Sequence, residues 1–307
     1  MKNIKLILFL IIYSFIIDNS KAIENKILFK VNSEIITSLD ILNEIRYLEI
    51  INQEFKKTQK KQAFEIAKRS LIREKIKEIE LKKNLKELKV KEKLMNKILI
   101  DYFNKYQINS ISEFEEYFSS IGIDSRLIRK KITIELLWNE LIFKRFNQNI
   151  KIDKKLIEKN IKNTNNKKDF LLSEILFSLE DKEKLDKKYK LIENSIEKTN
   201  FAQSALIYSI SSTARAGGKL GWIKETVFNT EINNVIKSMK IGDYSKPIVI
   251  PGGFLILKIE DIRKSNDKID LEKEIKKIVD KRRNEQLNQF SNIYFNKIKK
   301  NITIDEL

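Results

Sequence analysis

Apolar residues recur every three or four positions through most of the first half of the chain, the period of amphipathic helices. Thr37, with Asp40 three residues later, has the pattern of a capping box, in which side chains satisfy free backbone amides at a helix start. An apolar stripe follows from Ile41 to Phe55. Four further helices are expected at about residues 60–83, 90–106, 112–119 and 125–147. Such stripes are typical of core packing, and we interpret Trp138, Phe143 and Phe146 as core residues.

Residues 169–263 follow a different pattern, with short apolar runs separated by turn residues. This window holds six of the seven glycines and both prolines, the residues that mark tight turns. Apolar runs of strand length lie at residues 170–177 and 252–259, and helical spacing is found at residues 181–198 and 230–239. The pattern predicts a compact unit of short strands and helices.

The segments around this window connect it to the helical part of the chain. Residues 27–36 are typical of a strand, a turn and a short return, and residues 160–168 are a polar, periodless linker. Residues 271–298 form a long amphipathic pattern, and the last residues alternate like a strand. A strand at 302–304 needs a partner, and 27–31 is the obvious unpaired one. We therefore expect the carboxyl-terminal helix to return to the amino-terminal module.

The amino terminus has the order of a secretory signal peptide. Lys2 and Lys5 precede an apolar core at residues 6–17, and Ser20 and Ala22 form a small-x-small end. The core is shorter than the roughly 20 residues that a membrane-spanning helix needs. We expect a signal peptide at residues 1–22, cleaved after Ala22, and a periplasmic protein; the alternative is an uncleaved membrane anchor.

The composition excludes several kinds of chemistry. The chain has no cysteine and no histidine, which removes disulfides, thiolate nucleophiles, histidine-containing triads and histidine metal sites. Acidic pairs such as Glu115 and Glu116 lie on predicted surface helices. No cofactor and no metal are therefore expected.

The formal net charge of +18 raises the question of an anionic partner. The lysines, however, stand beside glutamates along predicted helices, as at residues 74–78 and 86–89. Solvated helix faces account for this pattern better than a binding stripe does. We expect no nucleic-acid partner and at most peripheral membrane contact, while a basic adaptor for an anionic surface stays open as an alternative.

Five ordered motifs in the turn-rich window carry a resemblance to a known domain. They are Ser-Glu-Ile-Leu at 173–176, Phe-Ala…Tyr-Ser at 201–209, Gly-Gly-Lys-Leu-Gly-Trp at 217–222, Gly-Asp…Lys-Pro-Ile at 242–248, and Gly-Phe-x-Ile-Leu-Lys at 253–258. This window resembles a parvulin-type (PpiC) peptidyl-prolyl isomerase domain.

The remainder of the chain is similar to the SurA family of periplasmic chaperones, in the order of its elements and in phrases at residues 29–38 and 150–153. The resemblance implies an α+β fold, with a mainly helical module completed by a carboxyl-terminal helix and strand and one inserted parvulin-like α/β domain. The expected units are a helical chaperone domain at 23–163, a parvulin domain at 169–263 and a docking segment at 270–307.

Parvulins usually place two histidines and a cysteine or aspartate around the prolyl bond. At the matching positions this chain has Glu174, Leu255 and, within about two residues, Ser211. The resemblance therefore implies no confident catalytic residue and an isomerase activity that is weak or lost. Candidates for the peptide-binding pocket are Trp222, Phe228 and Phe254, and for Phe228 plain core packing is an equal alternative.

The resulting hypothesis is a periplasmic chaperone that holds unfolded polypeptides, outer-membrane proteins in particular as the resemblance implies. The helical module would offer an apolar groove to extended clients. An active prolyl isomerase is the enzyme alternative, distinguished by peptide turnover. A basic adaptor is the third, distinguished by a steep dependence of binding on salt.

Overall fold

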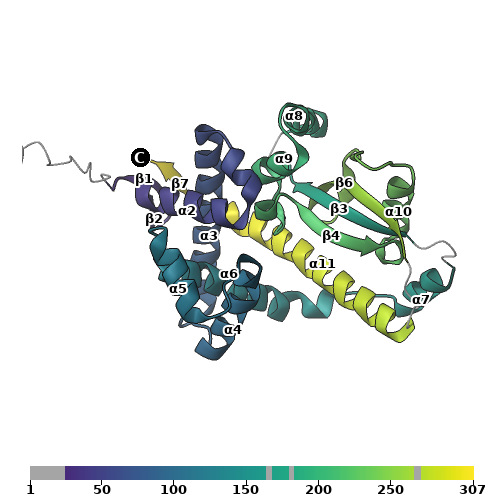
Figure 1. Ribbon diagram of the computed structural model, residues 1–307, viewed down its shortest axis with the longest axis horizontal. Helices are drawn as coiled ribbons and strands as arrows, with labels where there is room; N and C mark the ends of the chain where they lie inside the picture. The colour runs from purple at the N-terminus through teal and green to yellow at the C-terminus, as the bar shows by residue number, and fades with distance from the viewer. Residues whose placement is uncertain (1–24, 164–167, 180–182, 266–270) are drawn as a thin grey trace, which may run out of the picture.

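The computed structural model describes residues 25–163, 168–179, 183–265 and 271–307. These residues form a mainly helical module and an α/β domain, and the long helix α11 (Leu271–Lys299) extends along both (Figure 1). This arrangement confirms the predicted α+β fold class. The expected signal peptide at residues 1–22 lies outside the described residues. Within them, no helix combines the length and the apolar character needed to span a bilayer.

The helices of the amino-terminal module follow the predicted stripes closely. They are α2 (Ser38–Ile51), α3 (Lys60–Asn84), α4 (Glu92–Phe103), α5 (Ile111–Ser120) and α6 (Ser125–Phe146), with a 3-10 turn η1 (Gln53–Lys57) after α2. The predicted capping box starts α2: the Asp40 amide donates to Thr37 Oγ1 at 3.2 Å, and the Thr37 amide donates to Asp40 Oδ2 at 2.8 Å. Local sequence therefore determines where this helix begins.

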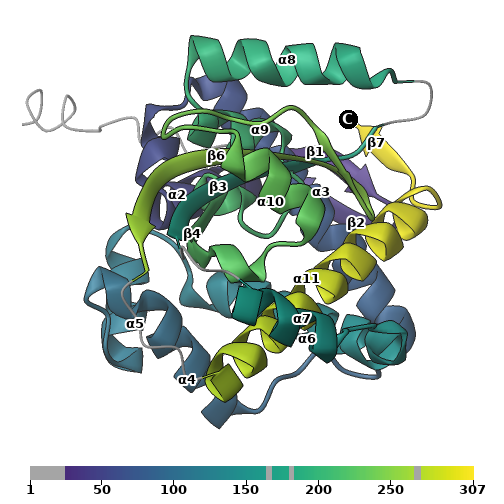
Figure 2. The same ribbon diagram turned by 90° about the vertical axis from the view of Figure 1, so that its right-hand side faces the viewer.

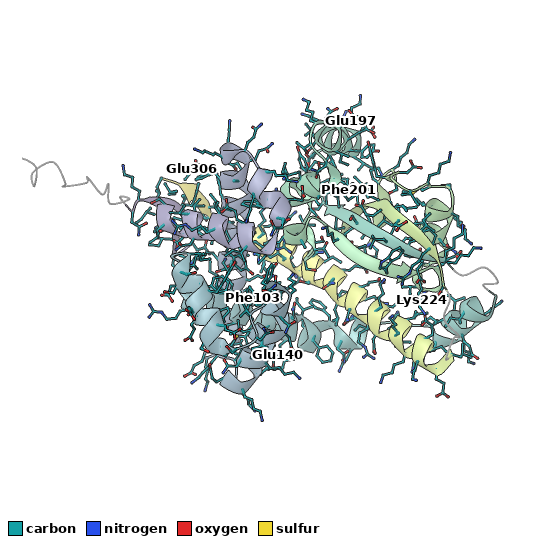
Figure 3. All side chains as sticks on the ribbon, viewed as in Figure 1. Phe103, Glu140, Glu197, Phe201, Lys224 and Glu306 are labelled. Atoms are coloured by element: carbon teal, nitrogen blue, oxygen red, sulfur yellow. The ribbon has the colours of Figure 1, made fainter. Side chains whose placement is uncertain are left out.

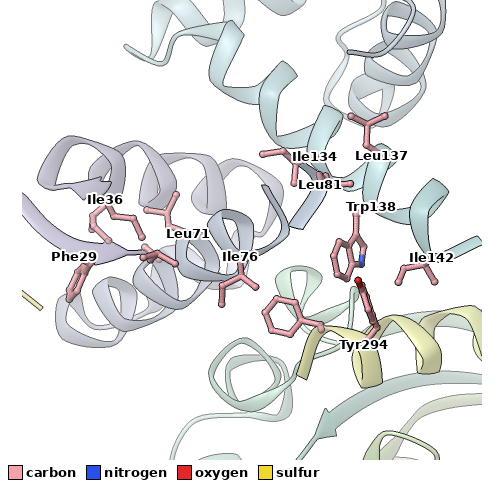
Figure 4. Close-up of a cluster of buried hydrophobic side chains, with 14 residues drawn as sticks. Phe29, Ile36, Leu71, Ile76, Leu81, Ile134, Leu137, Trp138, Ile142 and Tyr294 are labelled. Atoms are coloured by element: carbon pink, nitrogen blue, oxygen red, sulfur yellow. The ribbon is translucent and has the colours of Figure 1, made fainter. Parts of the chain in front are cut away.

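The two larger apolar clusters of the helical module lie in different parts of it. One lies between α3, α6 and the end of α11, where Trp138 and Tyr294 stack with ring centroids 5.8 Å apart (Figure 4). The other fills the lobe of α4 and α5, where Phe103 lies in the interior (Figure 3) with Phe114 and Phe118 against its ring. Helix α11 thus supplies part of the core of a module that begins more than two hundred residues earlier in the chain.

A small sheet closes the module and brings the two ends of the described chain together. Its strands are β1 (Ile27–Val31), β2 (Glu34–Thr37) and β7 (Ile304–Glu306), in the order β2-β1-β7. Strand β7 runs antiparallel to β1, with Val31 opposite Ile304 (Figure 1). The predicted pairing of the carboxyl-terminal strand with residues 27–31 is present, and the strand begins two residues later than expected.

The α/β domain is a four-stranded antiparallel sheet of order β4-β3-β6-β5, covered on both faces by helices. Helices α8 and α9 lie on one face, and α11 lies on the other with α7 and α10 (Figure 2). The elements are α7 (Lys154–Asn163), β3 (Lys168–Phe177), α8 (Leu185–Lys198), α9 (Phe201–Tyr208), β4 (Lys219–Lys224), α10 (Thr230–Lys237), β5 (Ile248–Ile250) and β6 (Gly253–Lys264).

Two sequence-based expectations are wrong, one about α7 and one about α6. Residues 160–163, predicted as linker, are the last residues of α7, because Ile157 and Ile161 lie four residues apart on one helix face and are buried in the core of the α/β domain. Residues 164–167 of that expected linker lie outside the described residues. Phe143, predicted as core, is 44% exposed, whereas Trp138 is buried and Phe146 stacks on Phe290.

Helix α11 joins the two cores. Ile278 and Val279, in its first half, are buried against the sheet of the α/β domain. Tyr294 and Phe295, in its second half, are buried against α3 and α6 of the helical module. The α/β domain therefore shares its hydrophobic core with a helix that the helical module also needs.

Candidate functional site

A cavity of about 620 Å³ lies between the sheet of the α/β domain, helix α11 and helix α3. The sheet side is mostly apolar, with Phe228, Leu255 and Leu257 among its lining residues. The helices contribute charged side chains, including Lys281 and Glu285 from α11 and Arg69, Arg73 and Lys77 from α3. The cavity thus has an apolar wall on one side and charged walls on the others.

The apolar wall follows from the pairing of β3 with β6. Leu176 lies opposite Leu255, and Glu174 lies opposite Leu257. Residues directly opposite each other, and residues two apart on one strand, point to the same face of a sheet. Three leucines and one carboxylate therefore face the cavity together. Phe228 continues this wall, and its ring meets that of Phe170 edge-on at 6.0 Å.

The carboxylate in this wall is held by a chain of hydroxyl groups. Thr213 Oγ1 donates to Glu174 Oε1 at 2.8 Å, the hydroxyls of Ser211 and Thr213 are 2.7 Å apart, and those of Ser209 and Ser211 are 3.0 Å apart. The Leu176 amide donates to Ser209 Oγ at 3.1 Å. Burial raises the pKa of Glu174 above its ordinary value, against the opposing effect of the hydrogen bonds from Thr213 and Ser211.

Gly218 explains how the loop that carries these hydroxyls comes so close to β3. The Glu174 amide donates to the Gly218 carbonyl at 2.7 Å. Gly218 has a φ of +77°, and a Cβ at this position would lie 2.1 Å from the Glu174 carbonyl oxygen. Only glycine allows this approach, so the Gly-Gly motif positions the serine and threonine hydroxyls next to Glu174.

The structure brings the three predicted parvulin positions into one cavity. Glu174, Ser211 and Leu255 all line it, with Ser211 linked to Glu174 through Thr213. Thr213 is a member of this network that the sequence did not single out, because the motif defines the strand position and not the hydroxyl that bridges to it. Leu255 presents only hydrocarbon, so the network does not continue onto β6.

Of the three aromatic pocket candidates, Phe228 lines this cavity, whereas Trp222 and Phe254 are not among its described lining residues. Phe254 precedes Leu255 on β6 and so points to the other face, where its ring stacks on Phe177 at 5.5 Å. Trp222 is 39% exposed, and the Arg263 guanidinium lies 4.2 Å from its ring centroid. Strand alternation therefore turns Phe254 away from the cavity, whereas Phe228 reaches it from the end of the 3-10 turn η5 (Glu225–Val227).

Sequence reasoning missed the helical walls entirely. Lys281 and Glu285 lie one turn apart on α11 and face Glu174; burial lowers the pKa of Lys281 and raises that of Glu285. No motif marks these positions, because in a chain so rich in lysine and glutamate an inward-facing pair resembles a solvated one. Among the described residues, no group of three or more potential metal ligands comes together.

Comparison with known proteins identifies the α/β domain. Residues 170–261 match the family described as "Rotamase: PPIC-type PPIASE domain". The chain is 25% identical over 177 residues to the Chaperone SurA of Pseudomonas syringae pv. tomato, covering 54% of this chain and 41% of that protein. It is 28% identical over 167 residues to the Chaperone SurA of Nitrosococcus oceani, covering 50% of this chain and 39% of the relative. The chain thus spans less than half the length of these relatives.

The chain is also similar to solved structures. One is a SurA-like chaperone from Campylobacter jejuni, which is 15% identical, with 92% of this chain and 99% of that chain covered and a TM-score of 0.37. A crystal structure of a PpiC-type peptidyl-prolyl cis-trans isomerase domain is 31% identical, with 32% of this chain and 94% of that one covered and a TM-score of 0.29. The family match covers residues 170–261, and the α/β domain that contains them is called the parvulin domain below; the chain is similar to the SurA chaperones.

Proposed function

We propose that this chain is a SurA-like chaperone of the periplasm that holds unfolded polypeptides, outer-membrane protein chains in particular. The observation that carries the proposal is the cavity of about 620 Å³ between the parvulin sheet and the helical module, with its wall of Leu176, Leu255, Leu257 and Phe228. Its size and apolar wall suit a few residues of an extended polypeptide. The similarity to proteins named Chaperone SurA and the signal-peptide pattern at residues 1–22 support the location and the client class.

Binding in this cavity would be driven by burial of apolar client side chains, at about 25 cal/mol for each Å² removed from water. Such burial requires no sequence readout, so many different clients can bind weakly. The proposed units at 23–163, 169–263 and 270–307 would act together, because α11 lines the cavity and packs into both cores. Release follows from weak and reversible binding.

In this proposal the parvulin domain binds proline-containing segments but isomerises them slowly or not at all. The side chain of Leu255 neither donates nor accepts a hydrogen bond, and the side chains of its neighbours Leu176 and Leu257 are equally apolar. The alternative, an active isomerase, is favoured by one observation: the hydroxyl chain from Ser209 to Glu174 is a polar network in the same cavity. Rotation about a prolyl bond requires no proton transfer, so turnover measurements are needed to separate the two.

The test compares two isoleucines of the parvulin domain in suppressing the aggregation of an unfolded outer-membrane barrel protein, followed by light scattering. Ile250 lies opposite Gly253, on the sheet face that Leu255 shares; it is half-buried and lines the cavity. Ile241 is 56% exposed and is not among the described lining residues. Ile250→Gln should weaken client protection by about tenfold, because burying an isoleucine side chain is worth roughly 1.5 kcal/mol or more. Ile241→Gln is the matched control and should protect like the unchanged chain.

Phe228→Ala tests a buried residue of the same wall. Thermal melting checks that each variant still folds. Equal protection by the Ile250 and Ile241 variants would place client binding outside this cavity, and an unchanged chain that protects no client would overturn the chaperone proposal. Acceleration of prolyl exchange well beyond its uncatalysed tens of seconds would make the isomerase alternative primary. Protection that disappears at high salt would favour the basic adaptor.

A further inference from the structure

The end of the cavity that faces the helical module is lined by three arginines from two domains. Arg69 and Arg73 lie one turn apart on α3, and Arg215 comes from the 3-10 turn η4 (Ala214–Ala216) of the parvulin domain. Arg69 is exposed at the mouth of the cavity, whereas Arg73 and Arg215 are half-buried. Residues far apart in the sequence thus present guanidinium groups to one enclosed space.

Each of these arginines is held by neutral acceptors. Arg69 Nη2 donates to the Leu206 carbonyl at 2.6 Å, Arg73 Nη2 donates to Asn292 Oδ1 at 3.2 Å, and Arg215 Nη2 donates to Ser70 Oγ at 2.8 Å. The Arg73 guanidinium also lies 4.2 Å from the ring centroid of Phe295. Among the described ion pairs, none joins any of the three to a carboxylate. A guanidinium has five N–H donors, so each retains donors for a ligand.

The charges around the three arginines do not balance. Lys77 pairs with Glu135 at 2.6 Å, and Lys131 lies 2.5 Å from both Glu44 and Glu74. Five cations therefore face three carboxylates in this cluster, an excess of two positive charges. At the mouth, Lys105 lines the cavity and Glu65 acts on Arg69, and these two cancel each other.

Burying this excess positive charge is energetically unfavourable. Burial lowers the pKa of Arg73 to about 10, against the opposing charge of Glu135 and together with the positive charges of Arg215 and Arg69. It lowers the pKa of Lys77 to about 8, although Glu135 is its ion-pair partner. Burial alone would also lower the pKa of Arg215, but the carboxylates of Glu44 and Glu135 raise it above its ordinary value. All three groups remain largely protonated at neutral pH, so an anion entering the cavity would relieve the excess.

We propose that this arginine-lined end of the cavity binds a carboxylate of the polypeptide held there, from its carboxyl terminus or from an acidic side chain. The inference rests on the proposed chaperone function and adds that the client binds in one direction, with its carboxylate at the arginine-lined end of the cavity. A guanidinium matches a carboxylate with two parallel N–H donors. The client's carboxylate lies at Arg73 and Arg215, and its apolar side chains lie over Leu255 and Phe228. Near the sheet, Lys281 already faces two carboxylates, Glu174 and Glu285, so a further carboxylate gains nothing there.

The test uses three fluorescently labelled peptides of one apolar, extended sequence, with binding followed by anisotropy. One has a free carboxyl terminus, one is amidated, and one is amidated with a single internal glutamate. The full chain should bind the first or the third about tenfold more tightly than the neutral amide, as a charge-assisted pair in a partly desolvated site would give. The first and third peptides together distinguish a terminal carboxylate from an acidic side chain.

Arg73→Met retains the aliphatic stem and should reduce the preference for the carboxylate peptide to less than about twofold. Arg126→Met is the matched control: it removes the same charge from a side chain that is 87% exposed and pairs with Asp124 outside the cavity, and it should leave the preference unchanged. Arg69→Met replaces Arg73→Met if circular dichroism shows that the latter is unfolded. Inorganic phosphate should compete with the carboxylate peptide more strongly than with the amide.

Failure of this inference is distinguishable from failure of the chaperone proposal. Equal affinity of the full chain for all three peptides, with aggregation suppression intact, overturns the carboxylate site alone. Inorganic phosphate that binds while the peptide carboxylate brings no gain in affinity also overturns it. No binding of any peptide, together with no suppression of aggregation, overturns the proposed function itself.

Discussion

Glu174 has a structural effect that its position in the parvulin motif does not reveal. Its carboxyl group is buried in the cavity wall, receives hydrogen bonds from hydroxyls, and faces Lys281 and Glu285 on α11. Burial raises its pKa above the ordinary value of 4.5, so the folded protein holds this proton more tightly than the unfolded chain does. The associated stability is fully present below about pH 4.5 and is lost as the pH rises through the folded pKa.

Glu174→Gln should therefore raise the melting temperature near neutral pH and have little effect in acid. Each unit of the pKa rise corresponds to about 1.4 kcal/mol. The glutamine oxygen still accepts the Thr213 hydrogen bond, so the network is retained. Thermal melts at neutral and acidic pH measure the difference, with Glu140→Gln, a surface carboxylate paired with Lys144, as the control. A stability change that is the same at both pH values would show that ionisation of Glu174 is not its cause.

At the scale of single elements, α6 illustrates how a helix with an apolar stripe also carries buried charge. Lys131 lies within this stripe, and its Nζ is 2.5 Å from the carboxylates of both Glu44 on α2 and Glu74 on α3. The pKa of Lys131 is raised, because these two charges outweigh the burial that alone would lower it. One lysine thus joins three helices of the module.

Lys131→Met should destabilise the protein by about 3–5 kcal/mol, because it leaves two carboxylates of a buried network without their cation. Lys130→Met is the matched control on the same helix. Lys130 is 46% exposed, and its partner Glu78 keeps Lys82 and Lys75, so a loss of at most about 1 kcal/mol is expected. Urea unfolding followed by circular dichroism measures both, and equal losses would show that the network around Lys131 is as weak as a surface pair.

At the scale of the whole molecule, helix α11 packs against both the helical module and the parvulin domain. It extends along both parts of the molecule (Figure 1). It contributes Ile278 and Val279 to the core of the parvulin domain and Tyr294 (Figure 4) and Phe295 to that of the helical module. It also lines the cavity between them. Strand β7, at the end of the described chain, contributes much less, since all three of its residues are exposed. The two parts of the carboxyl-terminal segment therefore have unequal importance for stability.

Deleting residues 270–307 should abolish the cooperative melting of the helical module, because Trp138 loses its stacked partner Tyr294 and the buried contacts around it. Deleting only residues 301–307 removes β7 and should lower the melting temperature by a few degrees while the transition stays cooperative. Thermal unfolding by far-UV circular dichroism compares the two truncations with the full chain. A long truncation that melts like the full chain would show that α11 is not part of this core.

The sequence alone was sufficient for the fold class, for the helices of the amino-terminal module and for the pairing of the carboxyl-terminal strand with residues 27–31. The helices are local features, because periodicity, caps and turn residues act between neighbours in the chain. The strand pairing is not local, and it was predicted because residues 27–31 were the obvious strand left as a partner for residues 302–304. Motifs of fixed spacing also pointed to Glu174 and Leu255, and to Ser211 within about two residues; all three line the cavity, and their part in function stays a prediction. The linker was misjudged because Ile157 and Ile161 of α7 pack against residues of the α/β domain that are distant in the sequence.

Only the tertiary structure decided which side chains face the cavity. Phe254 and Leu255 are adjacent in sequence, yet strand alternation sends one to the far face of the sheet and the other into the cavity wall. Arg73 and Arg215 meet because the parvulin domain docks on α3, and nothing near either residue in the sequence predicts that contact. In a chain with 61 lysines and arginines, an inward-facing cation has the same local pattern as a solvated one, and only packing between distant elements distinguishes them.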